Sequence, residues 1–151
     1  MISDTARNAA MVLYALPKLF YYEHLIRKHA IDDIVKKISK KNHRQNRSCP
    51  TGNARGRNLL ILWKACHFIQ HRLLRKEKPC LPRSLVLFDW CLRKGQRATL
   101  VIGLKKTENH LEGHSWLVID GKPFQENLAF LDTFHVVFST DTETVYRVSG
   151  I

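Results

Sequence analysis

The sequence predicts an α+β fold in which several helices precede a small antiparallel sheet. Three observations support this fold class. Apolar residues recur at helical spacing as far as residue 94, and Gly95 then offers a helix stop. A near-continuous apolar run, Ala98–Leu104, is typical of a buried strand. A later apolar segment is split by Asp120-Gly121, a pair typical of a hairpin turn.

Four helices are expected before the sheet, over residues 5–29, 32–39, 59–75 and 81–94. The first is expected to bend at Pro17, because proline removes a helical hydrogen bond. In the last, Pro82 fits the first turn and Gly95 fits a left-handed cap. The expected apolar face of the first helix comprises Met11, Leu13, Leu16, Phe20 and Leu25.

Residues 40–58 separate the second and third helices. This stretch is rich in Lys and Arg, has no Asp or Glu, and contains the turn formers Pro50, Gly52 and Gly56. We therefore expect a basic loop or linker there. The expected organisation is a helical N-terminal region, residues 1–58, followed by a core domain, residues 59–151.

The sheet is expected to begin with the strand at 98–104. A polar loop at 107–113 follows, and then a hairpin of strands 115–119 and 122–126 around Asp120-Gly121. Two further strands are expected at 135–139 and 145–148.

The chain has 151 residues, 44% of them hydrophobic, which is enough for a packed core. Its net charge of +12 predicts an anionic partner: nucleic acid, a membrane surface or an acidic peptide. The longest apolar stretch, Ala9–Phe20, is too short to span a membrane, and the first residues do not resemble a signal peptide. We expect a cytoplasmic protein with reduced thiols.

Cys80 is the candidate nucleophile. It stands where a loop ends and the last expected helix begins, so exposed backbone N–H groups and the helix dipole favour its thiolate. His114 follows on an expected strand, within His114-Ser115-Trp116, and could accept the thiol proton. A helix-borne cysteine with a strand-borne histidine is the arrangement of papain-like and transglutaminase-like enzymes.

The stretch from Cys80 to Asn127 resembles the transglutaminase-like leader peptidases of lasso peptide biosynthesis. The matching segments occur in the same order as in that family: Cys80-Leu-Pro-Arg83-Ser84-Leu85, Leu92-Arg-Lys-Gly95, Leu100-Val-Ile-Gly-Leu104 and His114-Ser-Trp116-Leu-Val-Ile-Asp-Gly121. Ser115 and Leu117-Val118 depart from the family pattern, which has Ala and Val-Glu there. The resemblance implies a transglutaminase-like cysteine protease core.

The resemblance also implies an acid about twelve residues beyond the histidine as the third catalytic group. Glu126 has that spacing, and Asp120 is the competitor, although Asp is favoured in turns for local reasons. A two-residue hairpin loop would place Glu126 opposite Ser115, whereas a three-residue loop, Ile119–Gly121, would place it opposite His114. We predict the three-residue loop.

Other candidate residues have secondary roles. Arg83, Ser84 and Trp116 match the motif and are expected to support the site or contact substrate. Cys66 and Cys91 are expected to be core residues, Cys49 an exposed bystander, and His110 a less suitable base than His114. The pair His67 and His71 has metal-binding spacing but no third ligand, so we expect no metal and no cofactor.

The function that the resemblance implies is removal of the leader from a lasso peptide precursor through a Cys80 thioester. Its expected partners are the precursor, a separate leader-binding protein and an ATP-dependent macrolactam synthetase. Two alternatives stay open: a basic nucleic-acid-binding module without catalysis, for which no motif is present, and a transglutaminase-like acyltransferase that shares the thioester.

Overall fold

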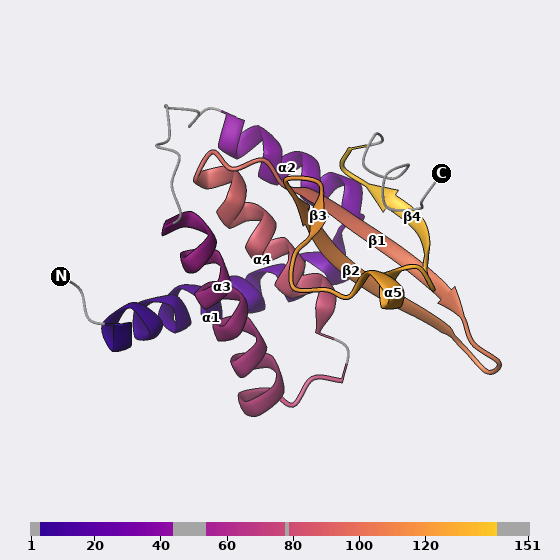
Figure 1. Ribbon diagram of the computed structural model, residues 1–151, viewed down its shortest axis with the longest axis horizontal. Coiled ribbons are helices and arrows are strands. Elements are labelled where there is room, and N and C mark those ends of the chain that lie inside the picture. The colour runs from indigo at the N-terminus through magenta and orange to yellow at the C-terminus, as the bar shows by residue number, and fades with distance from the viewer. Residues whose placement is uncertain (1–3, 44–53, 78, 142–151) are drawn as a thin grey trace. The chain divides into compact units, whose positions relative to one another are not determined.

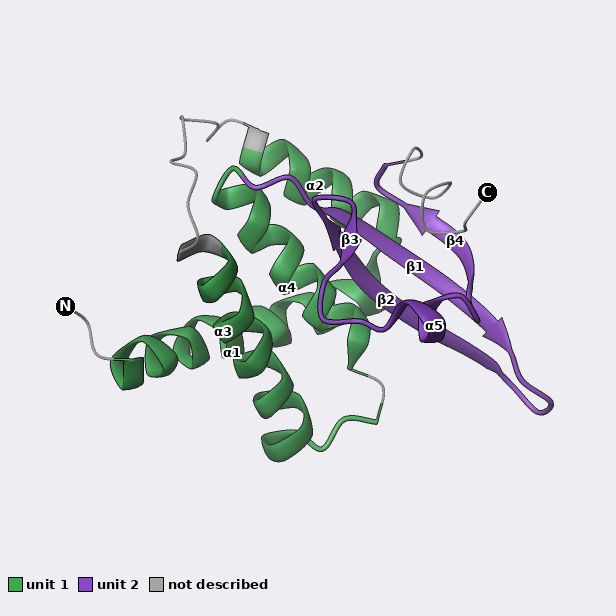
Figure 2. Cartoon of the chain, in the orientation of Figure 1, with its two compact units in different colours: residues 1–95 green, residues 96–151 purple. Residues whose placement is uncertain are grey.

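The computed structural model describes residues 4–43, 54–77 and 79–141. Cys49 and the strand expected at 145–148 lie outside these residues. Helices come first and a four-stranded antiparallel sheet follows, so the predicted α+β class is confirmed (Figure 1). The chain divides into two compact units, residues 1–95 and 96–151 (Figure 2). This division does not coincide with the boundary expected near residue 58.

Unit 1 is helical. Its elements are α1 (Asp4–Lys28), α2 (Ile31–His43), α3 (Ala54–Phe68), the π-helix η1 (Ile69–Leu73) and α4 (Cys80–Arg93). Helix α1 packs against α3 and α4, and α2 packs against α4. Because α1 shares this core with α3 and α4, residues 1–58 do not form a compact unit of their own. The expected basic loop is also shorter, since α2 continues to His43 and α3 begins at Ala54.

Helix α1 buries a different face from the one expected. Its buried residues are Met11, Ala15, Leu19, Tyr22 and Leu25, while Leu13 is 73% exposed and Phe20 is 50% exposed. The buried set follows the three- and four-residue spacing of one helix face, whereas Leu13 and Phe20 lie on another. The helix continues through Pro17. Among the described helices, none is long and apolar enough to cross a membrane.

Helix α4 begins and ends where its sequence predicts. Pro79 precedes the first residue, Cys80, and Pro82 lies in the first turn. At the other end, Gly95 has a φ of 65°, and its N–H donates to the Leu92 carbonyl. This left-handed cap is the one expected from the sequence.

The third expected helix changes its winding before it ends. After Phe68 the backbone forms the π-helix η1, in which the Leu74 N–H donates to the Ile69 carbonyl at 2.9 Å. Gln70 lies in this wider helical turn and is fully buried. Its side-chain Nε2 donates to the Pro79 carbonyl at 2.9 Å. One hydrogen bond therefore ties η1 to the residue immediately before Cys80.

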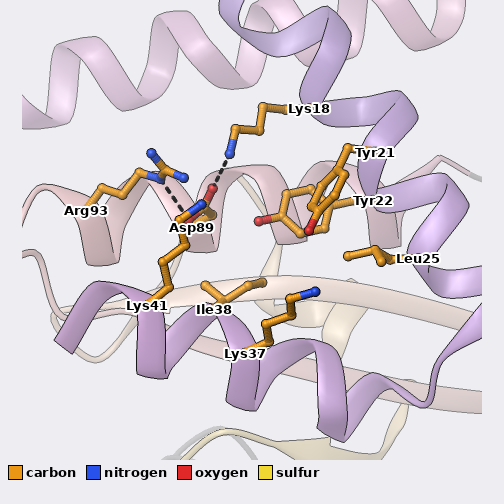
Figure 3. Close-up of a pocket in the computed structure, with 9 residues that line it drawn as sticks. All are labelled: Lys18, Tyr21, Tyr22, Leu25, Lys37, Ile38, Lys41, Asp89 and Arg93. Carbon is orange, nitrogen blue, oxygen red and sulfur yellow. Dashed lines mark hydrogen bonds and ion pairs between the residues drawn. The ribbon is translucent and has the colours of Figure 1, made fainter. Parts of the chain in front are cut away.

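A buried carboxylate joins three of the helices. Asp89 of α4 is 1% exposed and accepts hydrogen bonds from Lys18 of α1 (2.8 Å), Asn42 of α2 (3.1 Å) and Arg93 of α4 (2.9 Å). Figure 3 shows the bonds from Lys18 and Arg93. Burial by itself would raise the pKa of Asp89, but these donors outweigh it and hold the pKa below its ordinary value. Asp89 is therefore charged in the folded protein at neutral pH.

Unit 2 is built on a sheet with the strand order β3-β2-β1-β4. The strands are β1 (Thr99–Lys106), β2 (Leu111–Ile119), β3 (Lys122–Pro123) and β4 (His135–Ser139), with the short helix α5 (Leu128–Leu131) before β4. One cluster of buried apolar side chains forms a core on this sheet: Val101, Trp116, Val118, Leu131 and Phe134.

Two expectations for the sheet need correction. The polar loop is shorter than expected, because residues 111–113 belong to β2. Leu111, the first residue of β2, pairs with Lys106, the last residue of β1. The strand expected at 122–126 ends at Pro123, and helix α5 was not expected. Tertiary packing explains the helix, since Leu131 at its end enters the apolar core.

Replacing the buried carboxylate should destabilise the protein. Asp89→Asn leaves Lys18 and Arg93 facing an amide, so we expect a loss of about 2–3 kcal/mol in the free energy of unfolding by urea at pH 7. The control, Asp32→Asn, removes an exposed ion pair to Lys36 and should change stability far less than Asp89→Asn does.

The same variant should show a pH dependence. A carboxyl group whose folded pKa lies below its unfolded value stabilises the fold above that unfolded value, about 3.9, and the stabilisation is lost as the pH falls through the folded pKa. The gap between the unfolding free energies of wild type and Asp89→Asn should therefore narrow as the pH falls below about 3.9. A gap that is constant from neutral to acid pH would contradict the role assigned to Asp89.

Candidate active site

Cys80 is the first residue of α4, in unit 1, and its side chain is half-buried. The residue before it is held in place, because the Pro79 carbonyl accepts hydrogen bonds from the Gln70 side chain at 2.9 Å and from the Arg83 N–H at 3.5 Å. The thiol therefore stands at a helix start, where the N–H groups of the first turn and the helix dipole favour negative charge.

Arg83 and Ser84 lie in the first two turns of the same helix and are buried. The Arg83 guanidinium lies 5.4 Å from the centre of the Trp63 ring, and its Nη1 is 3.5 Å from His67 Nδ1. Both of those partners belong to α3. These contacts connect the cysteine-bearing end of α4 to α3, and they suit a supporting role for Arg83.

His67 and His71 lie side by side, but the described residues place no third metal ligand beside them. Their ring centres are 4.2 Å apart, and the Trp63 ring stacks on His67. Partial burial, then His71 and Arg83, lower the pKa of His67. Among the described residues, no group of three or more His, Cys, Asp or Glu side chains is placed to hold a metal ion.

His114 lies on β2, in unit 2, opposite Gly103 of β1. Three aromatic rings surround its imidazole: Trp116 is stacked at 5.9 Å, Phe130 meets it edge-on at 5.3 Å, and Phe134 is tilted at 5.6 Å between ring centres. The side chain is 15% exposed. The aromatic neighbours limit the rotation of the imidazole and keep it in a largely apolar setting.

Glu126 lies beside this imidazole. Its Oε1 is 3.3 Å from His114 Nε2, and both side chains are about six-sevenths buried, at 14% and 15% exposure. An acid in this position can orient the ring and stabilise its protonated form. Nε2 is therefore the ring nitrogen that faces the acid.

The hairpin register that was expected to bring this pair together is wrong. Ile119 pairs with Lys122, so the loop has two residues, Asp120 and Gly121, with φ of 51° and 75°. Continued alternation would have placed Glu126 opposite Ser115. The strand instead ends at Pro123, and Gln125 adopts a left-handed φ of 57°. That turn of the backbone redirects Glu126 toward His114.

The next residue fixes the end of this turn. The Asn127 side chain accepts a hydrogen bond from the Ala129 N–H at 2.9 Å and so caps α5. Glu126 is held between the left-handed Gln125 and this cap. Helix α5 in turn carries Phe130, which contacts the His114 ring. One short segment therefore supplies both the acid and part of the aromatic wall.

The alternative acid, base and thiols that the sequence offered have other structural surroundings. Asp120 is exposed in the hairpin turn, which agrees with its local role. His110 lies in the exposed turn between β1 and β2, where its carbonyl accepts hydrogen bonds from Thr107. Cys66 and Cys91 are buried core thiols, as predicted, and burial raises the pKa of each to about 12.

Three residues of the histidine's surroundings were not anticipated: Gly103, Phe130 and Phe134. The four-residue spacing of the two phenylalanines is a helical signal, but the segment is too short for periodicity alone to reveal α5. Gly103 has no Cβ, and one built there would lie 2.8 Å from Phe134 Cβ and 3.1 Å from the Trp116 ring. The glycine lets both rings approach β1.

The fold and the placement of these residues indicate a transglutaminase-like protein, and a comparison with known families agrees. The family model of the transglutaminase-like superfamily matches residues 31–139, and the chain belongs to that superfamily. The superfamily includes cysteine proteases and acyltransferases. No curated protein and no solved structure matches the chain significantly. Helix α1 lies outside the matched residues.

A methyl group on Gly103 should disturb the histidine's surroundings. Gly103→Ala forces Phe134 or Trp116 to move, so we expect a loss of about 1–3 kcal/mol in unfolding free energy, measured with urea. The matched control is Gly113→Ala on β2, where the new Cβ would meet only Leu104 Cδ2 at an ordinary 3.5 Å. Equal stability of the two variants would show that Gly103 is not needed for this packing.

Proposed function

We propose that this chain is a cysteine endopeptidase that removes the leader segment from a ribosomally made lasso peptide precursor. The observation that carries the proposal is the His114–Glu126 pair, with 3.3 Å between Nε2 and Oε1 in an aromatic enclosure. Membership of the transglutaminase-like superfamily and the position of Cys80 at a helix start support it. The ordered motifs around Cys80 and His114 supply the link to lasso leader peptidases.

In the proposed reaction, Cys80 and His114 meet in the working enzyme. His114 Nδ1 accepts the thiol proton, and Glu126 stabilises the resulting imidazolium. The thiolate attacks the carbonyl carbon at the junction of leader and core, and the Cys80 N–H donates to the oxyanion. The C–N bond then breaks, and the leaving core amine takes the proton from His114.

The leader is now a thioester on Cys80. A water molecule gives a proton to His114 and attacks this thioester, which releases the leader as a carboxylic acid and returns the thiol. Arg83 and Ser84 are proposed to hold the helix start during these steps, and Trp116 to form a wall of the site. No cofactor or metal takes part in the proposed reaction.

The proposed partners follow from this reaction. The freed core amine would pass to an ATP-dependent macrolactam synthetase, and a separate leader-binding protein would present the precursor. We place the reaction in the cytoplasm, where that synthetase finds its ATP. An acyltransferase would use the same thioester and differ only in that an amine replaces water.

Iodoacetamide alkylation tests the proposed pair without a substrate. Cys80 should react well below pH 8, roughly 10–100-fold faster than an ordinary thiol at about pH 6.5, as followed by peptide mass spectrometry. His114→Ala should abolish this excess, and Glu126→Gln should reduce it. Cys66 and Cys91 are internal controls, because burial makes them unreactive in the folded protein.

Asp120→Asn is the matched control for Glu126→Gln, since each change removes one carboxylate from the segment between β2 and α5. It should leave the Cys80 profile unchanged. A wild-type Cys80 that reacts like an ordinary thiol near pH 8.5, or one that His114→Ala does not affect, would overturn the proposed pair.

Cleavage of a lasso precursor in the presence of its leader-binding protein tests the reaction itself. We expect two fragments whose masses sum to the precursor plus one water, and none with Cys80→Ser. Added primary amine should leave the products unchanged, because water is the proposed acceptor. An amine adduct of the leader would instead identify an acyltransferase.

A further inference from the structure

A cationic pocket lies among α1, α2 and α4 of unit 1 (Figure 3). Its volume is about 60 Å³. The lining includes one acid, Asp89, and four cations, Lys18, Lys37, Lys41 and Arg93, so four positive charges minus one leave a net charge of +3. Asp89 is already bonded to Lys18 and Arg93. Lys18, Arg93 and Asp89 together carry a charge of +1, and the two lysines of α2 supply the other two positive charges.

Neither Lys37 nor Lys41 forms an ion pair among the described residues, although Asp33 of α2 lies four residues before Lys37. Lys36 forms an ion pair with Asp32 four residues earlier. Lys37 and Asp33 have the same four-residue spacing, but these two side chains form no ion pair. Lys37 and Lys41 extend from α2 toward the pocket instead (Figure 3).

Two like charges four residues apart on one helix face repel each other. Lys18 and Arg93 line the same pocket and exceed the charge of Asp89 by one, so the two lysines face one further positive charge. An anion between Lys37 and Lys41 would turn this repulsion into attraction on both sides. The arrangement suits an anion, since neither lysine forms an ion pair within the described part of the unit and Asp89 is already bonded to Lys18 and Arg93.

The size and the remaining lining favour a carboxylate on a peptide. A volume near 60 Å³ suits one small group such as a carboxylate. Tyr21, Leu25 and Ile38 line the same pocket and can pack against the aliphatic stem of a Glu side chain. Tyr21 is 45% exposed, so its ring is accessible to an arriving peptide.

We propose that this pocket binds a carboxylate side chain of an acidic peptide segment. The peptide nature of the ligand rests on the proposed function, whereas the anion site rests only on the pocket itself. Helix α1, which supplies Lys18, Tyr21 and Leu25, lies outside the residues that match the superfamily. The pocket therefore combines residues of α1, outside the matched segment, with residues of α2 and α4 inside it.

Fluorescence anisotropy with a fluorescein-labelled peptide of alternating Glu and Ser residues tests this proposal. At about 0.15 M salt, the double variant Lys37→Gln/Lys41→Gln should raise the Kd about tenfold. The matched control, Lys36→Gln/Lys40→Gln, removes the same charge from the same helix outside the pocket and should change the Kd less than about twofold. Glutamine preserves helix propensity, and equal thermal unfolding would confirm that both variants fold.

Three outcomes would overturn the proposal. An equal loss of affinity in both double variants would mean diffuse attraction to a basic chain, and no measurable binding to wild type would mean no site. A labelled oligothymidine whose affinity falls in the pocket variant alone, with the Glu peptide unaffected, would assign the pocket to nucleic acid.

The binding assay separates this proposal from the proposed function, because it requires no turnover. A precursor that binds at the pocket and is not cleaved would count against the peptidase alone. Cleavage with the same KM in both double variants would count against the pocket alone.

Discussion

The buried carboxylate of Asp89 is the constraint on which the rest of unit 1 depends. An isolated charge in the interior is strongly unfavourable, so Asp89 can stay ionised only while Lys18, Asn42 and Arg93 donate to it. These donors come from α1, α2 and α4, and satisfying one side chain thereby sets the mutual arrangement of three helices. Helix α4 carries the proposed nucleophile at its other end, and Gln70 fixes that end through the Pro79 carbonyl.

Two kinds of support serve the two parts of the candidate site. At Cys80 the support is polar: a side-chain amide on the preceding carbonyl and a guanidinium between α3 and α4. At His114 it is largely apolar, because Trp116, Phe130 and Phe134 surround the imidazole, and Glu126 lies at Nε2. A thiol benefits from nearby N–H dipoles, whereas an imidazole that must hold one orientation benefits from rigid rings.

Helix α1 contributes both to the helical core and to the cationic pocket of unit 1. It precedes the matched residues, yet it packs on α3 and α4 and contributes a donor to Asp89. The same lysine that stabilises the helix interface also lines the cationic pocket. Structural support and the proposed recognition of an acidic peptide therefore share residues, and the pocket exists only because α1 is docked on α2 and α4.

The sequence by itself determined the features that neighbouring residues decide. Helical and strand periodicity gave the α+β order, Pro82 and Gly95 marked the ends of α4, and Asp120-Gly121 marked a tight turn. Tertiary structure alone decided which face of α1 is buried, where the π-turn falls, and how Glu126 reaches His114. Gln125 carries no turn signal of its own, yet its backbone is left-handed, with a φ of 57°. Such contacts join residues distant in the chain, so local pattern cannot encode them.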